Sequence, residues 1–136
     1  MSFQLVIIES RLAGDVASNL AYARCLMRFC LRRGQAPFAS HCLYPQVLDD
    51  NIPDERALGI AAGLAWGNAA ALTVVGVDLG VSDGMRRGIA HARACCRQVE
   101  FVSLAKWRPS RAKAWELVYA LELVQPGADV FTLEAP

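Results

Sequence analysis

The feature that most constrains the fold is an alternation, along the chain, of short β-branched runs with longer segments of helical periodicity. The clearest runs are Gln4–Ile8 (QLVII) and Leu72–Val77 (LTVVGV), and both have the length and apolar character of buried strands. Ala36–Ser40, Val99–Leu104 and Val130–Leu133 are further strand candidates. Strands that alternate with helices predict an α/β fold with a parallel sheet and right-handed crossovers.

Three segments between these runs have the spacing of amphipathic helices. The first starts after Asp15, a good N-cap residue, and ends before Gly34. The second starts near Pro53, and the third starts at Ser82 or Asp83. The apolar faces that we expect are Val16, Leu20, Ala23, Met27 and Cys30 in the first, Leu58, Ala61, Leu64 and Ala65 in the second, and Met85, Ile89, Ala92 and Cys96 in the third.

This order predicts a small doubly wound sheet, Rossmann-like or flavodoxin-like, of four to five parallel strands with helices on both faces. With 136 residues the chain has the length of a single domain, residues 1–136. We assign residues 1–104 to its core and residues 105–136 to a C-terminal extension. Within that extension, Ser110–Val124 could form either a helix or a strand.

Composition argues against several classes of protein. The formal net charge is +1, which gives no general attraction to nucleic acid. The apolar runs are too short for a membrane span, and the N-terminus has no basic leader, so we expect a cytoplasmic protein. The five cysteines include no CxxC pair, and the two histidines do not stand at zinc-ligand spacing, so we expect no metal site and no cofactor.

In doubly wound sheets, ligands bind outside the carboxyl ends of the strands. That rule selects three loops, Glu9–Asp15, His41–Asn51 and Asp78–Met85, in which polar and glycine residues gather. The candidate ligand-binding residues in and beside these loops are Ser10, Arg11, Gly14, Asp15, His41, Tyr44, Ser82, Gly84, Met85 and Arg86.

Several of these residues have two interpretations. The helix start at Ser82 could bind a phosphate or carboxylate through its free N–H groups, or it could be an ordinary capped helix. Tyr44 could stack on a base or anchor its loop on the core. His41 could contact a ligand or exchange a proton with it, although a structural histidine at a strand end is more common. Arg11 could pair with a phosphate or stay in solvent.

Two motifs resemble those of nucleoside 2-deoxyribosyltransferases and the related deoxynucleoside-monophosphate N-glycosidases. Ser82, Gly84, Ile89 and Ala92 match the motif S-x-G-x-x-x-E-[LI]-x-x-A that follows the third strand of these enzymes. The loop ESRLAGD is similar to their first loop, S-P-x-x-G-D, at Ser10, Gly14 and Asp15. APFASHCLYPQVLDDNIPDERALGI looks like a bacterial and phage branch of the superfamily, and the resemblance spans about residues 4–104.

The main departure from the resemblance is Gly88, which stands where the enzymes carry their catalytic glutamate. Cleavage beside the anomeric carbon needs a carboxyl group as nucleophile or base. Nearby carboxylates that could substitute are Glu9, Asp15, Asp78 and Asp83, and we take Asp78 and Asp83 as the candidate catalytic residues.

Three functions remain open. The first is a protein that binds a nucleoside or nucleotide without turnover, for instance a phage-type protein that sequesters a signalling nucleotide. The second is an active N-glycosidase or deoxyribosyltransferase with a displaced carboxylate. The third is a non-catalytic interaction module that makes its contact through the apolar segment Trp115–Leu123. The resemblance also implies a homo-oligomer, a dimer or larger.

Overall fold

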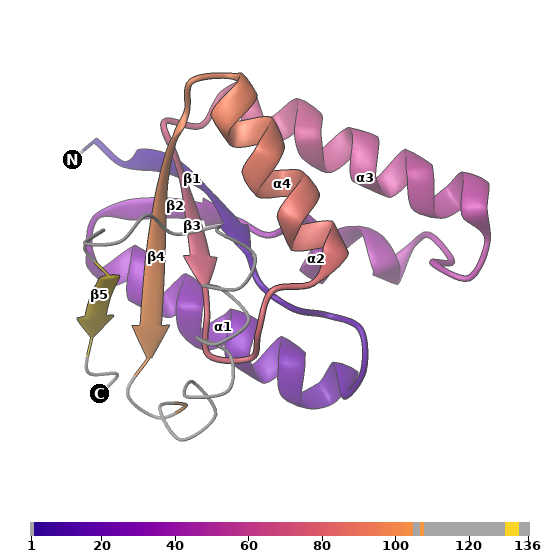
Figure 1. Ribbon diagram of the computed structural model, residues 1–136, viewed down its shortest axis with the longest axis horizontal. Coiled ribbons are helices and arrows are strands. Elements are labelled where there is room, and N and C mark those ends of the chain that lie inside the picture. Colours follow the sequence, from indigo (N-terminus) through magenta and orange to yellow (C-terminus); the bar gives the residue numbers. More distant parts are fainter. Residues whose placement is uncertain (1, 105–106, 108–129, 134–136) are drawn as a thin grey trace.

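Five parallel strands form one sheet in the order β2-β1-β3-β4-β5 (Figure 1). They are β1 (Gln4–Glu9), β2 (Gln35–Phe38), β3 (Leu72–Gly76), β4 (Gln98–Leu104) and β5 (Val130–Leu133). The structure is a computed structural model that describes residues 2–104, 107 and 130–133. It confirms the predicted α/β, doubly wound class and the strand at the C-terminal end. Ser110–Val124 and Trp115–Leu123 lie outside the described residues.

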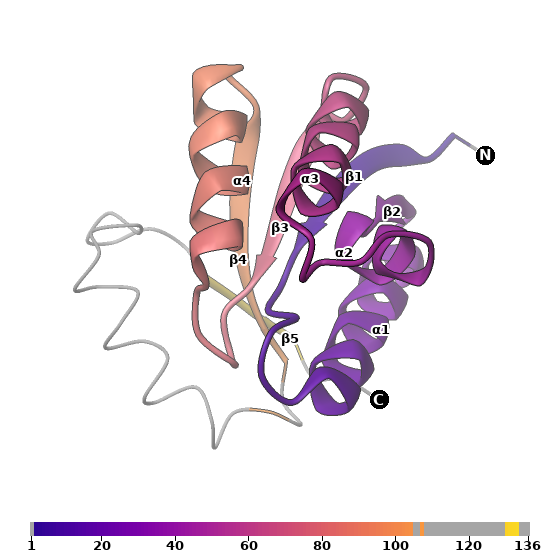
Figure 2. The ribbon, with the colours of Figure 1, turned by 90° about the vertical axis from the view of Figure 1, so that its right-hand side faces the viewer.

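Helices cover both faces of the sheet (Figure 2). Helix α1 (Val16–Arg32) packs on one face, and α3 (Pro53–Gly67) and α4 (Asp83–Ala94) lie on the other. The α1 side of the core contains Val6, Ile8, Tyr22, Leu26, Val74 and Val102, whereas the α4 side contains Val75, Val77, Val81, Met85, Ile89 and Phe101. Within the described residues, no helix has the length and apolar character needed to span a membrane.

The ends of α1 follow the sequence signals. The Asp15 side chain accepts a hydrogen bond from the Ser18 backbone N–H at 3.2 Å, which is the predicted N-cap. Gly34 follows the helix with a φ of +75°, a left-handed conformation that costs a residue with a side chain about 1–2 kcal/mol. Val16 and Cys96 are exposed, contrary to expectation, because Val16 is the first residue of its helix and Cys96 lies beyond the end of α4.

The predicted strand Ala36–Ser40 was placed too late in the chain. Strand β2 begins at Gln35, which pairs with Gln4 of β1, and it ends at Phe38. The following segment is not a plain loop, because it contains the short helix α2 (Ser40–Leu43) and a 3₁₀-helix (Tyr44–Gln46).

Three of the four residues of the expected apolar face of α3 are exposed, and only Leu64 is half-buried. Leu58 is 60% exposed, and Ala61 and Ala65 are exposed as well. The helix instead packs through glycines, since a Cβ atom on Gly63 would lie 2.7 Å from Ser40 Oγ and one on Gly67 would lie 2.9 Å from Arg97 Nη1. Close packing through glycines leaves no periodic signal of large apolar residues.

Candidate functional site

The chain reverses its direction of winding between β1 and β3. From β1 it continues to β2 on one side, and it then returns to β3 on the other side of β1. The loops that leave β1 and β3 therefore diverge at their carboxyl ends, and such a switch point is where doubly wound sheets bind ligands. Two of the three predicted loops, Glu9–Asp15 and Asp78–Met85, flank this point.

Ser10 and His41, two of the predicted site residues, are in direct contact at this edge. Ser10 Oγ lies 2.7 Å from His41 Nε2, and the hydrogen bond joins the loop after β1 to α2. Only 4% of Ser10 is exposed. Burial lowers the pKa of His41 to about 4, so the imidazole is neutral at pH 7. A neutral imidazole that is hydrogen-bonded to a hydroxyl can form a further hydrogen bond to a ligand through its other ring nitrogen, without placing a charge in the site.

The remainder of the first loop is held in place by its own hydrogen bonds. Asn19 of α1, which the sequence did not single out, donates to the carbonyls of Leu12 and Ala13 at 2.8 and 3.0 Å. Arg11 Nε also donates to the Ala13 carbonyl, at 3.3 Å. Gly14 has a φ of +103° and lies exposed before the α1 N-cap. The loop thus has a defined shape, with the Arg11 guanidinium at the β1 edge.

Tyr44 belongs to an aromatic cluster. Its hydroxyl accepts a hydrogen bond from Trp66 Nε1 at 2.9 Å, and its ring meets the Phe38 ring edge-on at 6.2 Å between centroids. Phe38 also stacks at a tilt on Trp66, with centroids 5.1 Å apart. These contacts favour the interpretation of Tyr44 as an anchor for its loop.

Ser82 caps α4 as the sequence predicts. Its hydroxyl accepts a hydrogen bond from the Met85 N–H at 3.3 Å, and the Ser82 N–H approaches Met85 Sδ at 3.4 Å. Met85 is 2% exposed and its side chain fills the core beneath α4. Gly84 and Asp83 stay exposed at the start of the helix.

Arg86 is exposed on α4, with 48% of its side chain accessible, and lies beside the buried face that contains Met85 and Ile89. Arg86 Nη1 lies 3.9 Å from Asp83 Oδ1, and both side chains are largely exposed. Together with Arg87 and Arg93 they line a shallow hollow on the outer side of α4.

Asp78, one of the two carboxylates proposed as catalytic, is fully buried in the core. Its Oδ2 accepts hydrogen bonds from the Tyr22 hydroxyl and the Leu104 N–H, both at 2.8 Å. Its Oδ1 accepts from the Ser103 hydroxyl at 2.6 Å. Asp78 thus ties α1 and β4 to the end of β3, and both of its oxygens already have protein partners. Asp83, the other candidate, is exposed at the start of α4.

A further carboxyl group at this edge is that of Glu9, the last residue of β1. It lies directly against Gly88 of α4: a Cβ atom on Gly88 would be 2.9 Å from Glu9 Oε2 and closer still to Oε1. Burial raises the pKa of Glu9 to about 8, and the positive charge of Arg97 only partly opposes this rise. Among the described residues, no hydrogen bond or ion pair involves the Glu9 carboxyl, and its oxygens are not among the fully buried ones.

Residues 4–102 match the family described as a domain of unknown function, DUF7768. The chain belongs to the DUF7768 family. No curated protein gives a significant match. The matched range covers β1 to β3 and most of β4, and it includes the loops that follow β1 and β3 in this DUF7768 domain.

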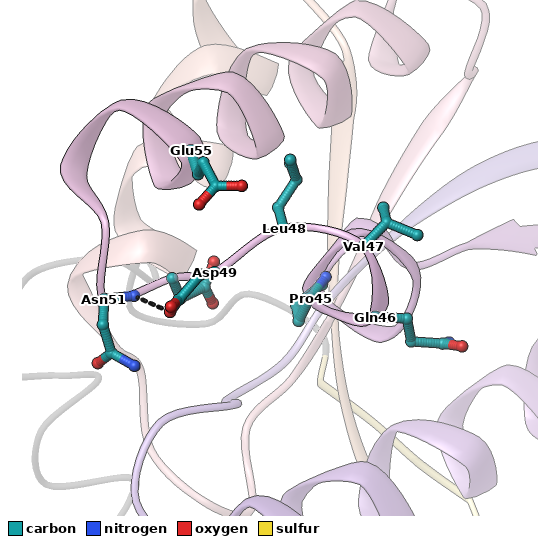
Figure 3. Close-up of a pocket in the computed structure, with 8 residues that line it drawn as sticks. Pro45, Gln46, Val47, Leu48, Asp49, Asn51 and Glu55 are labelled. Carbon is teal, nitrogen blue, oxygen red and sulfur yellow. Dashed lines mark hydrogen bonds between the residues drawn. The ribbon is translucent and has the colours of Figure 1, made fainter.

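A separate hollow of about 560 Å³ lies in the loop before α3 (Figure 3). Asp49, Asp50 and Glu55 line it, and the Asn51 N–H donates to Asp49 Oδ1 at 2.9 Å. That bond is the turn chemistry common for Asp and Asn. Its lining includes no residue of β1 or β3. No group of three potential metal ligands occurs in the described part of the chain.

Proposed function

We propose that this DUF7768 domain binds a nucleoside or nucleotide at the carboxyl ends of β1 and β3. The observation that carries the proposal is the strand order, which puts the switch point between these two strands. The polar residues of the first loop and the capped start of α4 stand on either side of it. The motif resemblance to nucleoside-processing enzymes runs through the same two loops.

The electrostatics of the site suit a ligand that carries phosphate. Glu9, with a pKa of about 8, and His41, with a pKa of about 4, are both uncharged at pH 7. The β1 edge therefore holds two buried polar groups without presenting a buried negative charge. The Arg11 guanidinium and the N–H groups at the start of α4 then supply the positive potential that attracts an anion.

The physiological setting that we propose follows the resemblance. A phage-type protein that sequesters a signalling nucleotide is one form of this function, and the protein would act as a homo-oligomer. All five cysteines are free, which fits a reducing compartment such as the cytoplasm.

The test is to incubate purified protein with nucleosides, nucleoside monophosphates, and cyclic or ADP-ribose-type nucleotides. Bound and free fractions are then separated and identified by chromatography and mass. The proposal predicts that at least one ligand is retained, and that Ser10→Ala and His41→Ala weaken its binding at least tenfold. Gln98→Ala, an exposed change at the opposite end of β4, is the control and should bind like the wild type. If nothing is retained or converted, the domain is an interaction module instead.

A further inference from the structure

We propose that Cys95 and Cys96, two adjacent exposed cysteines at the end of α4, form a thiol-exchange site that reacts with a small disulfide, and that His91 accepts the proton of the attacking thiol. Helix α4 runs from the end of β3 to the start of β4, so the pair lies at the amino edge of the sheet, opposite the proposed ligand site. The inference therefore goes beyond the proposed function and does not depend on nucleotide binding.

The first observation is that both thiols are open to solvent. Of the five free cysteines, Cys30 is buried and Cys25 and Cys42 are half-buried, whereas Cys95 and Cys96 are exposed. Free cysteine is among the residue types most often found buried in proteins. A reagent in solution therefore reaches two thiols at one point of this surface.

The second observation is a contact between Cys95 and a histidine. Cys95 Sγ lies 3.7 Å from His91 Nε2, and His91 precedes Cys95 by about one turn of α4. In the tautomer that carries its proton on Nδ1, the imidazole accepts a hydrogen bond from the thiol through Nε2. The thiolate and not the thiol is the nucleophile, so a base in contact with Sγ makes Cys95 the attacking member of the pair.

The third observation is the backbone at the end of α4. The Cys96 N–H donates to the Arg93 carbonyl at 3.0 Å, and the Arg97 N–H donates to the Ala92 carbonyl at 2.8 Å, which together form a Schellman motif. Cys96 occupies the left-handed position of this motif, with a φ of +56°, where glycine is the usual residue. The chain thus keeps an exposed thiol at a position that the backbone disfavours, which indicates that the thiol serves chemistry and not packing.

Arg97, the residue after the pair, holds this turn in place. Its Nε donates to Thr73 Oγ1 at 3.0 Å, and its Nη1 donates to the Gly67 carbonyl at 2.5 Å. The two acceptors belong to β3 and α3, so the end of α4 is tied to two other elements. A turn that is fixed in this way keeps Cys95 within reach of His91, as proton transfer between them requires.

The reaction that follows is a thiol–disulfide exchange in two steps. Cys95 passes its proton to His91 and its Sγ attacks one sulfur of the small disulfide, whose S–S bond breaks, and the leaving thiolate takes up the proton from His91. Cys96 then attacks Cys95 Sγ in the mixed disulfide and releases the second small thiol. The two protein thiols are oxidised to one disulfide, and the small disulfide is reduced to two thiols.

The product disulfide is easily reversed. Adjacent Cα atoms are about 3.8 Å apart, below the range of about 4.4–6.8 Å that is usual for disulfides, so the bond between Cys95 and Cys96 is strained. Strained, exposed disulfides are readily reduced by small thiols. The site therefore alternates between a dithiol and a disulfide according to the balance of small thiols and disulfides around it.

The experiment incubates the reduced, folded protein with oxidised glutathione, stops the exchange with acid, alkylates the remaining thiols and locates each modification by peptide mass. We expect the pair to react about tenfold faster than Cys25 or Cys42. His91→Gln should slow the reaction of the pair by about tenfold, because it removes the base. Cys25→Ser is the matched control and should leave the reaction of the pair unchanged.

A further variant tests the second step without disturbing the fold. Cys96→Gly suits the left-handed turn, so the protein should fold as well as the wild type, as judged by circular dichroism, while glutathione accumulates on Cys95. If the pair reacts no faster than Cys25 and Cys42, or if His91→Gln reacts at the wild-type rate, the inference is wrong. It is also wrong if the wild type and Cys96→Gly end in the same mixed disulfide. The retention assay tests the binding proposal separately, and none of these outcomes affects it.

Discussion

The buried Glu9 carboxyl predicts an unusual pH dependence of stability. Its pKa is about 8 in the folded protein and 4.5 in the unfolded chain, because folding removes the carboxyl from water. Between these two values the unfolded chain releases the proton and the folded protein keeps it. The stability contributed by protonated Glu9 is therefore fully present below pH 4.5 and is lost as the pH rises towards 8. Over 3.5 pH units, at about 1.4 kcal/mol per unit, the loss approaches 5 kcal/mol.

Glu9→Gln isolates this effect because glutamine has the same shape and does not ionise. We expect wild type and variant to have similar free energies of unfolding at pH 4.5, and the variant to be more stable at pH 8.5 by several kcal/mol. Urea unfolding followed by far-ultraviolet circular dichroism, with reductant present, measures the difference at each pH. Groups common to both proteins cancel in that difference. A difference that stays constant from pH 4.5 to 8.5 would refute the assignment of a buried, protonated Glu9.

Three further predictions concern Tyr22, Gly34 and His41. Tyr22→Phe should lower the free energy of unfolding by about 1–3 kcal/mol, because buried Asp78 loses the hydroxyl donor at 2.8 Å, and unchanged urea unfolding would contradict the network. Gly34→Ala, at a φ of +75°, should lower the free energy of unfolding by about 1–2 kcal/mol in the same assay. Gly84→Ala, at the open start of α4, is the control and should leave it unchanged. Equal effects of the two substitutions would contradict the claim that the left-handed conformation at position 34 requires glycine. Burial lowers the pKa of His41 from 6.5 to about 4, so the contribution of neutral His41 to stability should fall by up to about 3 kcal/mol as the pH falls between these values, opposite in sign to the Glu9 effect. The difference in unfolding free energy between wild type and His41→Gln, in which the Glu9 contribution cancels, should change by that amount, and a constant difference would contradict the burial of His41.

The fold could be predicted from the sequence because its main signals are local. The apolar runs of β1 and β3, the Asp15 cap and the Gly34 stop each act within a few residues, and each appears in the structure where the pattern indicates. Helix α3 shows the limit of such patterns. Its packing uses Gly63 and Gly67, whose contribution is the absence of a side chain, so hydrophobic periodicity selected the wrong face.

The candidate site could be predicted only in part, because its decisive contacts join distant parts of the chain. The rule for strand ends brought Ser10 and His41 into the same region, and the structure places them 2.7 Å apart. Asp78 also follows a strand, but its hydrogen-bond partner Tyr22 is 56 residues away in the sequence. No local pattern therefore reveals that the Asp78 carboxylate is buried in the core. The position of the Glu9 carboxyl depends likewise on Gly88, and only the packing of α4 on β1 brings the two residues into contact.

The measurement that tests the central claim most directly is a titration of isotope-labelled protein with the retained nucleoside or nucleotide, followed through the backbone amide signals. The account predicts that the largest shifts fall in residues 9–15, 39–44 and 78–85, at the carboxyl edge of the sheet, and that distant exposed positions such as Gln98 hardly change. Shifts that instead gather in the hollow of residues 45–55 or at the amino edge of the sheet would show that the ligand site lies elsewhere, and would contradict the account.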